Sequence, residues 1–219
     1  MGFGLLFIGY IFFLYIFPIG TQFLSIAAAI LLLALYKLSR YHAGFRRAAY
    51  LSLALFLFGL PSLADILLDS YGISLPIPQI ALSILTVASL ATLIVFHVFL
   101  FGAIADLAKQ TSLFRLQVAA TQNRLFTAVF CGLLLINEIL TPQIVSHLSE
   151  NDAKRALIYI LLGRILFGLI IAGLNLVMLY SAYMRFCPPG QEKQGATEYQ
   201  SFINAKNAQS RSRKGDSEK

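Results

Sequence analysis

Long apolar stretches alternate with short polar ones along most of this chain, and several are long enough to form helices that cross a membrane. Their limits predict six helices, at about residues 3–17, 22–38, 48–69, 79–108, 125–145 and 156–183. Polar side chains recur inside these stretches at helical spacing, and no stretch reads as a strand. The pattern predicts an all-α, polytopic membrane protein with six transmembrane helices.

The segments between the helices define the predicted organisation. The first two helices are short for a bilayer and meet at residues 18–20, so we interpret them as a tight hairpin, with a re-entrant pair as the alternative. Residues 109–124 are predicted to form a short interfacial helix or an extension of the fourth helix. Pro188 and Pro189 end the last helix. We therefore predict a transmembrane domain over 1–186 and a disordered cytoplasmic tail over 187–219.

Composition supports a membrane location. Hydrophobic residues make up 58% of the 219 residues and charged residues only 12%, whereas a soluble domain has roughly a quarter charged residues. The net charge of +7 comes mostly from loops and the tail, so it does not indicate nucleic acid. Cys131 and Cys187 lie in different environments, and no disulfide between them is expected. No metal-ligand spacing occurs, and no metal or cofactor is predicted.

The distribution of basic residues predicts the orientation. If the amino terminus is inside, the external loops contain only Lys154 and Arg155, and fourteen of the seventeen basic residues are cytoplasmic. Six of these are in the tail, and eight are in the loops: Lys37, Arg40, Arg46, Arg47, Lys109, Arg115, Arg124 and Arg185. Basic residues are concentrated on the cytoplasmic side of membrane proteins. We therefore predict a multi-pass protein of a cell membrane with both termini in the cytoplasm.

The last predicted helix carries a polar stripe. Arg164, Gly168, Ala172 and Asn175 fall on one face at helical spacing, while large apolar side chains cover the rest. An arginine in lipid is costly. We expect this face to contact protein or water instead of acyl chains.

Glu138 and Arg164 are predicted to be partners. Counted from the predicted helix ends, they lie about 10 Å and about 12 Å below the same membrane surface, on consecutive antiparallel helices. One interpretation is a structural ion pair that fixes helix register. The other is a functional polar site shared with further residues, for which the candidates are Asp65, Asn137, Asn175 and His97.

The segment from Leu35 to Arg47 is the densest basic loop. Its Lys37, Arg40, Arg46 and Arg47 are expected to act as an orientation signal and to contact anionic lipid headgroups. This segment, with its apolar flanks, resembles small multi-span bacterial membrane proteins of uncharacterised activity. The resemblance implies a bacterial inner membrane and no particular activity.

No motif specifies an activity: H-E-x-x-H, G-x-S-x-G and a glycine-rich phosphate loop are all missing from the sequence. Our leading hypothesis is a non-catalytic membrane component that acts through helix packing and its basic cytoplasmic face, with lipids and a partner membrane protein as its contacts. The alternatives are a small transporter or channel around Glu138 and Arg164, and an enzyme that modifies lipids at the membrane surface.

Overall fold

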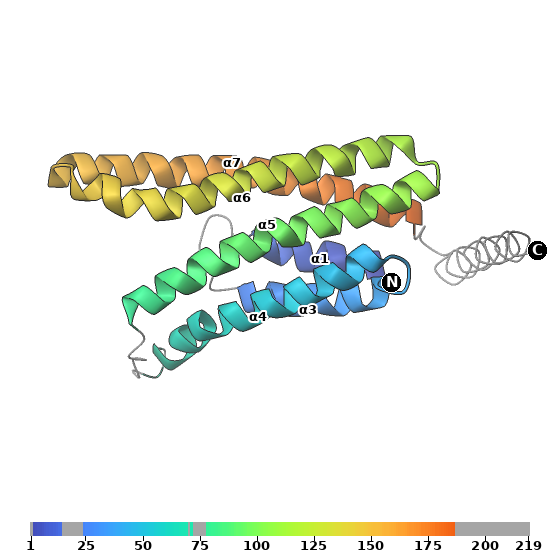
Figure 1. Ribbon diagram of the computed structural model, residues 1–219, viewed down its shortest axis with the longest axis horizontal. Helices are drawn as coiled ribbons and strands as arrows, with labels where there is room; N and C mark the ends of the chain where they lie inside the picture. The colour runs from blue at the N-terminus through green and yellow to red at the C-terminus, as the bar shows by residue number, and fades with distance from the viewer. Residues whose placement is uncertain (1, 15–23, 70, 72–77, 187–219) are drawn as a thin grey trace, which may run out of the picture.

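The computed structural model describes residues 2–14, 24–69, 71 and 78–186. It is helical throughout this part, with α1 (Gly2–Leu14), α3 (Leu24–Leu38), α4 (Ala43–Asp69), α5 (Gln79–Gln110), α6 (Phe114–Ser146) and α7 (Glu150–Phe186) (Figure 1). The all-α prediction is confirmed. The predicted turn at 18–20 and the predicted tail at 187–219 lie outside the described residues.

Each helix packs against its neighbours in the chain, and α1 also packs against α7, so the contacts form a closed ring. In Figure 1, α6 and α7 run together as a long hairpin on one side, α3 and α4 lie on the other, and α5 runs between them. The two ends of the described helical core meet, because the rings of Phe3 and Phe186 stack with their centroids 5.1 Å apart.

Four of the described helices, α4 to α7, are long and apolar enough to cross a membrane. The other two are shorter: α1 has 13 residues and α3 has 15, which correspond to about 20 Å and about 22 Å. A hydrocarbon core is about 30 Å thick. The described part of the chain thus contains four candidate spans, and six spans remain a prediction.

Three predicted helix starts were too late. α4 begins at Ala43 instead of residue 48, because Nδ1 of His42 accepts a hydrogen bond from the backbone N–H of Gly44 at 3.1 Å. α6 begins at Phe114 instead of 125, after a turn in which Ser112 has φ of 57° and the N–H of Leu113 donates to Ala108 O at 2.8 Å. Residues 109–124 are therefore neither a separate helix nor an extension of the fourth one.

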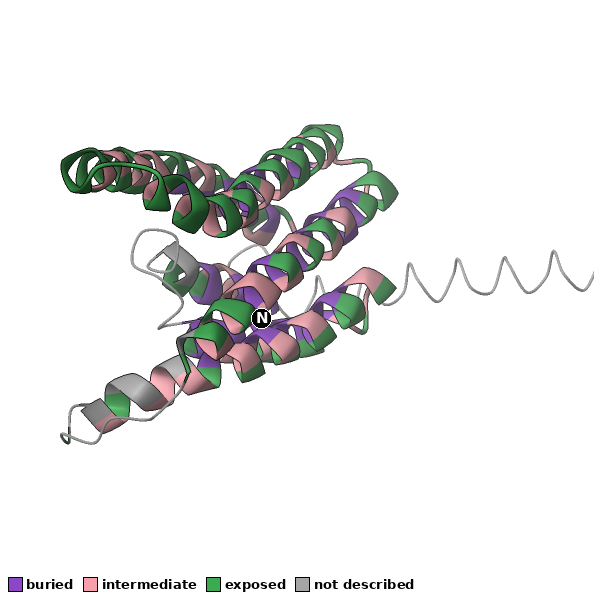
Figure 2. Cartoon of the chain, turned by 60° about the vertical axis from the view of Figure 1, so that its left-hand side comes forward, coloured by how far each residue is buried: buried purple, intermediate pink, exposed green. Residues whose placement is uncertain are grey.

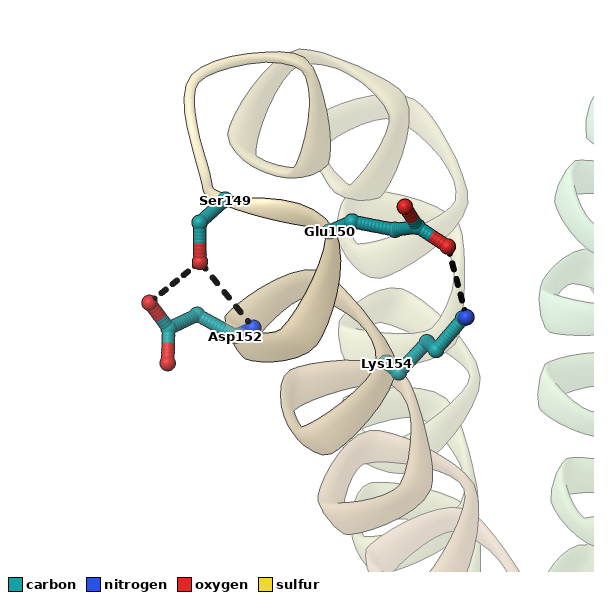
Figure 3. A network of polar contacts seen from close by, with 4 residues as sticks. All are labelled: Ser149, Glu150, Asp152 and Lys154. Atoms are coloured by element: carbon teal, nitrogen blue, oxygen red, sulfur yellow. Dashed lines mark hydrogen bonds and ion pairs between the residues drawn. The ribbon is translucent and has the colours of Figure 1, made fainter.

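α7 begins at Glu150 instead of 156 because of a cap that Figure 3 shows. The Ser149 hydroxyl accepts a hydrogen bond from the backbone N–H of Asp152 at 3.3 Å and donates to the Asp152 carboxylate at 2.6 Å. Lys154 pairs with Glu150 at 2.7 Å one turn along. Carboxylates in a first turn also interact favourably with the helix dipole. The polar residues 150–155, which were predicted to precede the last helix, therefore form the beginning of α7.

The buried core lies at the end of the bundle where Phe3 meets Phe186. Figure 2 shows buried residues concentrated where the helices cross, and exposed residues over the far part of the α6–α7 hairpin. From residue 135 to residue 167, none is buried. The far half of the hairpin therefore extends beyond the packed core.

Candidate functional site

A buried polar cluster joins four helices inside the packed core. Tyr10 comes from α1, His97 from α5, Thr127 from α6 and Asn175 from α7. Their exposed fractions are 0% for the first three and 1% for Asn175. Polar groups away from water must satisfy one another, so the cluster specifies how these four helices are placed.

The hydrogen bonds of this cluster have a defined direction. Leu93 O lies 2.8 Å from Nδ1 of His97 and can only accept, so Nδ1 carries a hydrogen. In a neutral ring Nε2 is then an acceptor, and it receives the Tyr10 hydroxyl at 2.9 Å. The Tyr10 oxygen in turn accepts from Nδ2 of Asn175 at 2.7 Å, and Nδ2 also donates to Thr127 Oγ1 at 2.8 Å. The chain of donors runs from Asn175 through Tyr10 to His97.

Aromatic rings surround the histidine. The Phe96 ring meets the His97 ring edge to face at 5.3 Å, and the Phe101 ring lies 5.5 Å from it. Asn123 Nδ2 donates to Leu174 O at 2.9 Å, which links α6 to α7 a second time, in addition to the bond between Asn175 and Thr127. This environment stabilises a packed, hydrogen-bonded histidine.

The polar stripe predicted on the last helix mostly faces protein. Gly168, Ala172 and Asn175 are buried, which confirms the prediction for these three positions. The fourth, Arg164, has 34% of its side chain exposed.

Sequence reasoning missed Tyr10, Asn123 and Thr127. Asn123 and Thr127 share one face at i and i+4, but the predicted helix began at 125, and this hid their spacing. Tyr10 lies within an aromatic and aliphatic run that gives no sign of its role.

The second polar group lies on the α6–α7 hairpin. Arg164 Nη1 is 3.8 Å from Glu138 Oε2, and each side chain is 34% exposed. This distance allows an ion pair but is too long for a hydrogen bond. Beside them, Thr141 Oγ1 donates to Asn137 Oδ1 at 2.9 Å. Within the described residues, the Arg164 guanidinium makes this ionic contact and no hydrogen bond.

Arg164 and Asn137 border two depressions that follow one another along the hairpin. One is an apolar groove of about 610 Å³ that also contains Phe130, Leu133 and Phe167. The other, of about 320 Å³, contains Glu138, Thr141 and Pro142. Pro142 lies inside α6 and leaves the Glu138 carbonyl without its helical donor. The hairpin thus presents donors and acceptors to both depressions.

The predicted polar residues fall into two groups. Glu138, Arg164 and Asn137 lie on the hairpin, whereas His97 and Asn175 lie in the core. Eleven residues separate Arg164 from Asn175, a rise of about 16 Å along α7. The side chain of Asp65 lies outside the described residues. The structure therefore gives two separate polar sites where the sequence suggested one shared site.

The basic residues of the predicted loop also lie at different places in the structure. Lys37 and Arg40 line a cavity between α1 and the end of α3, while the Arg47 guanidinium lies 5.5 Å above the Phe99 ring of α5. His42 Nε2 lies 3.7 Å from an Asp106 oxygen, and Arg46 is exposed.

No family model matches this chain, and neither the curated proteins nor the solved structures contain a match. The resemblance of residues 35–47 to bacterial membrane proteins stays a prediction. Among the described residues, no three His, Cys, Asp or Glu side chains gather as a metal site would require, and Cys131 is buried. Cys187 lies outside the described part of the chain.

Proposed function

We propose that this chain is a non-catalytic, multi-pass component of a cell membrane that binds a partner membrane protein along its α6–α7 hairpin. One observation carries the proposal: a charged pair, one third exposed, sits on a hairpin end in which no residue from 135 to 167 is buried. The rest of this surface is apolar, with Ile136, Leu140 and Leu162 among its exposed residues.

The physical argument concerns unmet hydrogen bonds. A guanidinium has five N–H donors, and lipid tails offer no acceptors. Arg164 lies inside α7, a helix long and apolar enough to cross a membrane, and in hydrocarbon both charges of the pair are costly. A transmembrane helix with a carboxylate or amide side chain would satisfy Arg164 and cover Glu138. Polar side chains hold membrane helices together in this way.

The proposal includes a six-span topology with both termini cytoplasmic. Its support is the excess of basic residues on one side and the contact between Phe3 and Phe186 at one end of the bundle. That end would face the cytoplasm, where Lys37, Arg40, Arg46 and Arg47 would contact anionic headgroups. Reporter fusions after residues 47, 124 and 219 should report cytoplasm, and fusions at 71 and 152 the exterior. A tail fusion that reports the exterior would refute six spans.

The partner is tested by site-specific photocrosslinking in membranes. A crosslinking residue at 136, 140 or 162 should give one discrete protein adduct, and the adduct should weaken when Arg164→Met and Glu138→Leu are introduced together. The matched controls are Leu33 on α3 and Leu53 on α4, which are also exposed and apolar. Equal yields of the same adduct at hairpin and control positions would refute the assignment of the hairpin.

A small transporter is the second candidate, and the apolar groove of about 610 Å³ beside Arg164 favours it. Its size suits a small molecule with an apolar body and an acceptor group. A chain that purifies alone, with a melting temperature raised by such a molecule in the parent but not in Arg164→Met, would support the transporter over the partner-binding component.

A further inference from the structure

A small cavity lies where α1 begins and α3 ends. Its volume is about 320 Å³, and it is lined by Gly2, Tyr36, Lys37, Arg40 and Tyr41. Two cations and two phenols therefore surround one hollow at the end of the bundle that we assign to the cytoplasmic surface.

The two cations are available for a ligand. None of the ion pairs in the described part of the chain includes Lys37 or Arg40, and both residues are exposed. An ammonium offers three donors and a guanidinium five, in geometries that suit phosphate oxygens. The cavity thus has an excess of positive charge and of hydrogen-bond donors.

Three of the last four carbonyl groups of α3, which would repel an anion, are occupied by local hydrogen bonds. Leu35 O accepts the Ser39 N–H at 2.7 Å, Tyr36 O accepts the Ser39 hydroxyl at 2.7 Å, and Leu38 O accepts the Tyr41 N–H at 2.9 Å. Local hydrogen bonds therefore reduce the negative potential expected at a helix C-terminus.

The start of α1 approaches α3 closely because residue 2 is glycine. A Cβ at this position would lie 2.7 Å from Leu38 Cγ and Cδ2, so a side chain here would push the two helices apart. The first turn of α1, whose N–H groups have no partner within the helix, is thereby held beside the two cations. Glycine thereby allows the first turn of α1 to form one wall of the cavity.

An apolar track leads from the cavity along α3. Ile26, Ile30, Leu33 and Lys37 follow one another at spacings of four, three and four residues, which places them on one face. Ile26 and Leu33 are 40% and 61% exposed. Tyr36, at the same end, has the amphipathic ring typical of a membrane interface. A ligand here would have its anionic group in the cavity and its apolar part on the track.

We propose that this cavity binds the phosphate group of an anionic membrane phospholipid, with Lys37 and Arg40 as its main ligands and the acyl chains along α3. The inference deepens the proposed headgroup contact, and it rests on the proposed function only in placing this end of the bundle at the membrane surface. It assigns a defined lipid site to one cavity, whereas the proposed contact concerns the whole basic face.

The test uses the full chain, purified in detergent, with phosphatidylglycerol or phosphatidylcholine added as the probe and bound lipid counted by native mass spectrometry. The parent should retain one phosphatidylglycerol in preference to phosphatidylcholine. Lys37→Gln with Arg40→Gln should lower this retention at least ~10-fold, the loss that a single charge-assisted hydrogen bond corresponds to. Lys37→Arg with Arg40→Lys keeps both charges and should retain the lipid.

The matched control is Lys109→Gln with Arg115→Gln, two exposed cations from the turn between α5 and α6. It should retain phosphatidylglycerol within about twofold of the parent, because an exposed charge outside the site contributes little. Equal losses in this control and in the cavity variant would overturn the defined site. All these positions are exposed, and an unchanged melting temperature would verify that each variant folds.

Free phosphate is distinguished from lipid by adding millimolar inorganic phosphate. If phosphate raises the melting temperature of the parent and displaces the lipid, the lipid assignment is overturned in favour of a soluble anion. The hairpin crosslinks are measured on the same variants. A parent protein that gives the hairpin adduct but retains no phosphatidylglycerol would overturn this inference alone, and a parent that retains phosphatidylglycerol but gives no adduct would refute only the proposed partner.

Discussion

The hydrogen bond between Asn175 and Tyr10 offers the most direct test of the core. Leucine has the same number and branching of heavy side-chain atoms as asparagine, so Asn175→Leu removes the bonds to Tyr10 and Thr127, at 2.7 Å and 2.8 Å, without leaving a cavity. Tyr10→Phe removes the hydroxyl that links Asn175 to His97. Both changes act on the same network from two helices that are 165 residues apart in sequence.

The expected magnitudes follow from measured hydrogen bonds between membrane helices, which average about 0.6 kcal/mol and reach about 1.7 kcal/mol. Each substitution removes the hydrogen bonds to two partner side chains, so each should lower the free energy of unfolding by about 1–3 kcal/mol. The loss in the double variant should be about 0.6–1.7 kcal/mol smaller than the sum of the two single losses. The reason is that each single variant already lacks the bond between the two residues, so the sum counts this bond twice.

The assay can use the reactivity of a thiol. Cys131 is buried in the core, so it reacts with a thiol dye only after unfolding, and Cys187→Ser leaves it as the sole thiol of the chain. Unfolding is then titrated with SDS in mixed micelles. The matched pair is Asn137→Leu with Thr141→Val, whose bond at 2.9 Å lies within α6. That helix persists in micelles, so this pair should show a coupling near zero.

Two results would contradict the reasoning. If Asn175→Leu were as stable as the parent, the buried network would contribute nothing to the fold. If the losses of Asn175→Leu and Tyr10→Phe were additive, the two side chains would not be hydrogen-bonded in the folded protein.

Three further predictions use the same unfolding assay. Gly59→Ala should lower the free energy of unfolding by about 1–3 kcal/mol, because its Cβ would lie 2.9 Å from a backbone nitrogen of α3. Gly173→Ala, whose Cβ would meet nothing within 4 Å, should leave stability unchanged or raise it by about 0.5–1 kcal/mol. Equal effects of the two changes would contradict the close packing at Gly59. Ser112→Val should cost about 1–2 kcal/mol, since φ is 57° there, and Ser112→Gly should be tolerated; a tolerated valine would rule out this turn conformation. Glu138→Ala and Arg164→Ala should each lower the free energy of unfolding by an amount between the ~1 kcal/mol of exposed pairs and the ~3–5 kcal/mol of buried pairs. The double variant should lose less than the sum of the two single losses. Additive losses would show that the 3.8 Å contact contributes nothing.

Periodicity along single helices predicted a large part of this structure. The apolar stretches predicted an all-helical protein, and the spacing of Gly168, Ala172 and Asn175 predicted the buried face of α7. The contact of Glu138 with Arg164 could also be predicted from positions along single helices. Two consecutive helices joined by a short turn must be antiparallel, and counting residues from their predicted ends placed both side chains at similar depth.

The helix starts were less predictable because they depend on local capping. Ser149 and Asp152 form a cap that extends α7 to Glu150, and a polar segment with this cap resembles a loop when only hydrophobicity is considered. Ser112 is not glycine, so the sharp turn before α6 had no conspicuous signal in the sequence. These errors hid the face that carries Asn123 and Thr127.

The polar core itself was decided by tertiary structure alone. Tyr10 meets His97 and Asn175 across 87 and 165 residues, and each of the three lies on a different helix. A single sequence shows which face of a helix is polar, but not which other helix that face will meet. That choice depends on the ring of contacts in which α1 packs against both α3 and α7. The chain determined its helices locally, and the pairing of their polar faces came from packing, because only a closed bundle can bury these groups with all their partners in place.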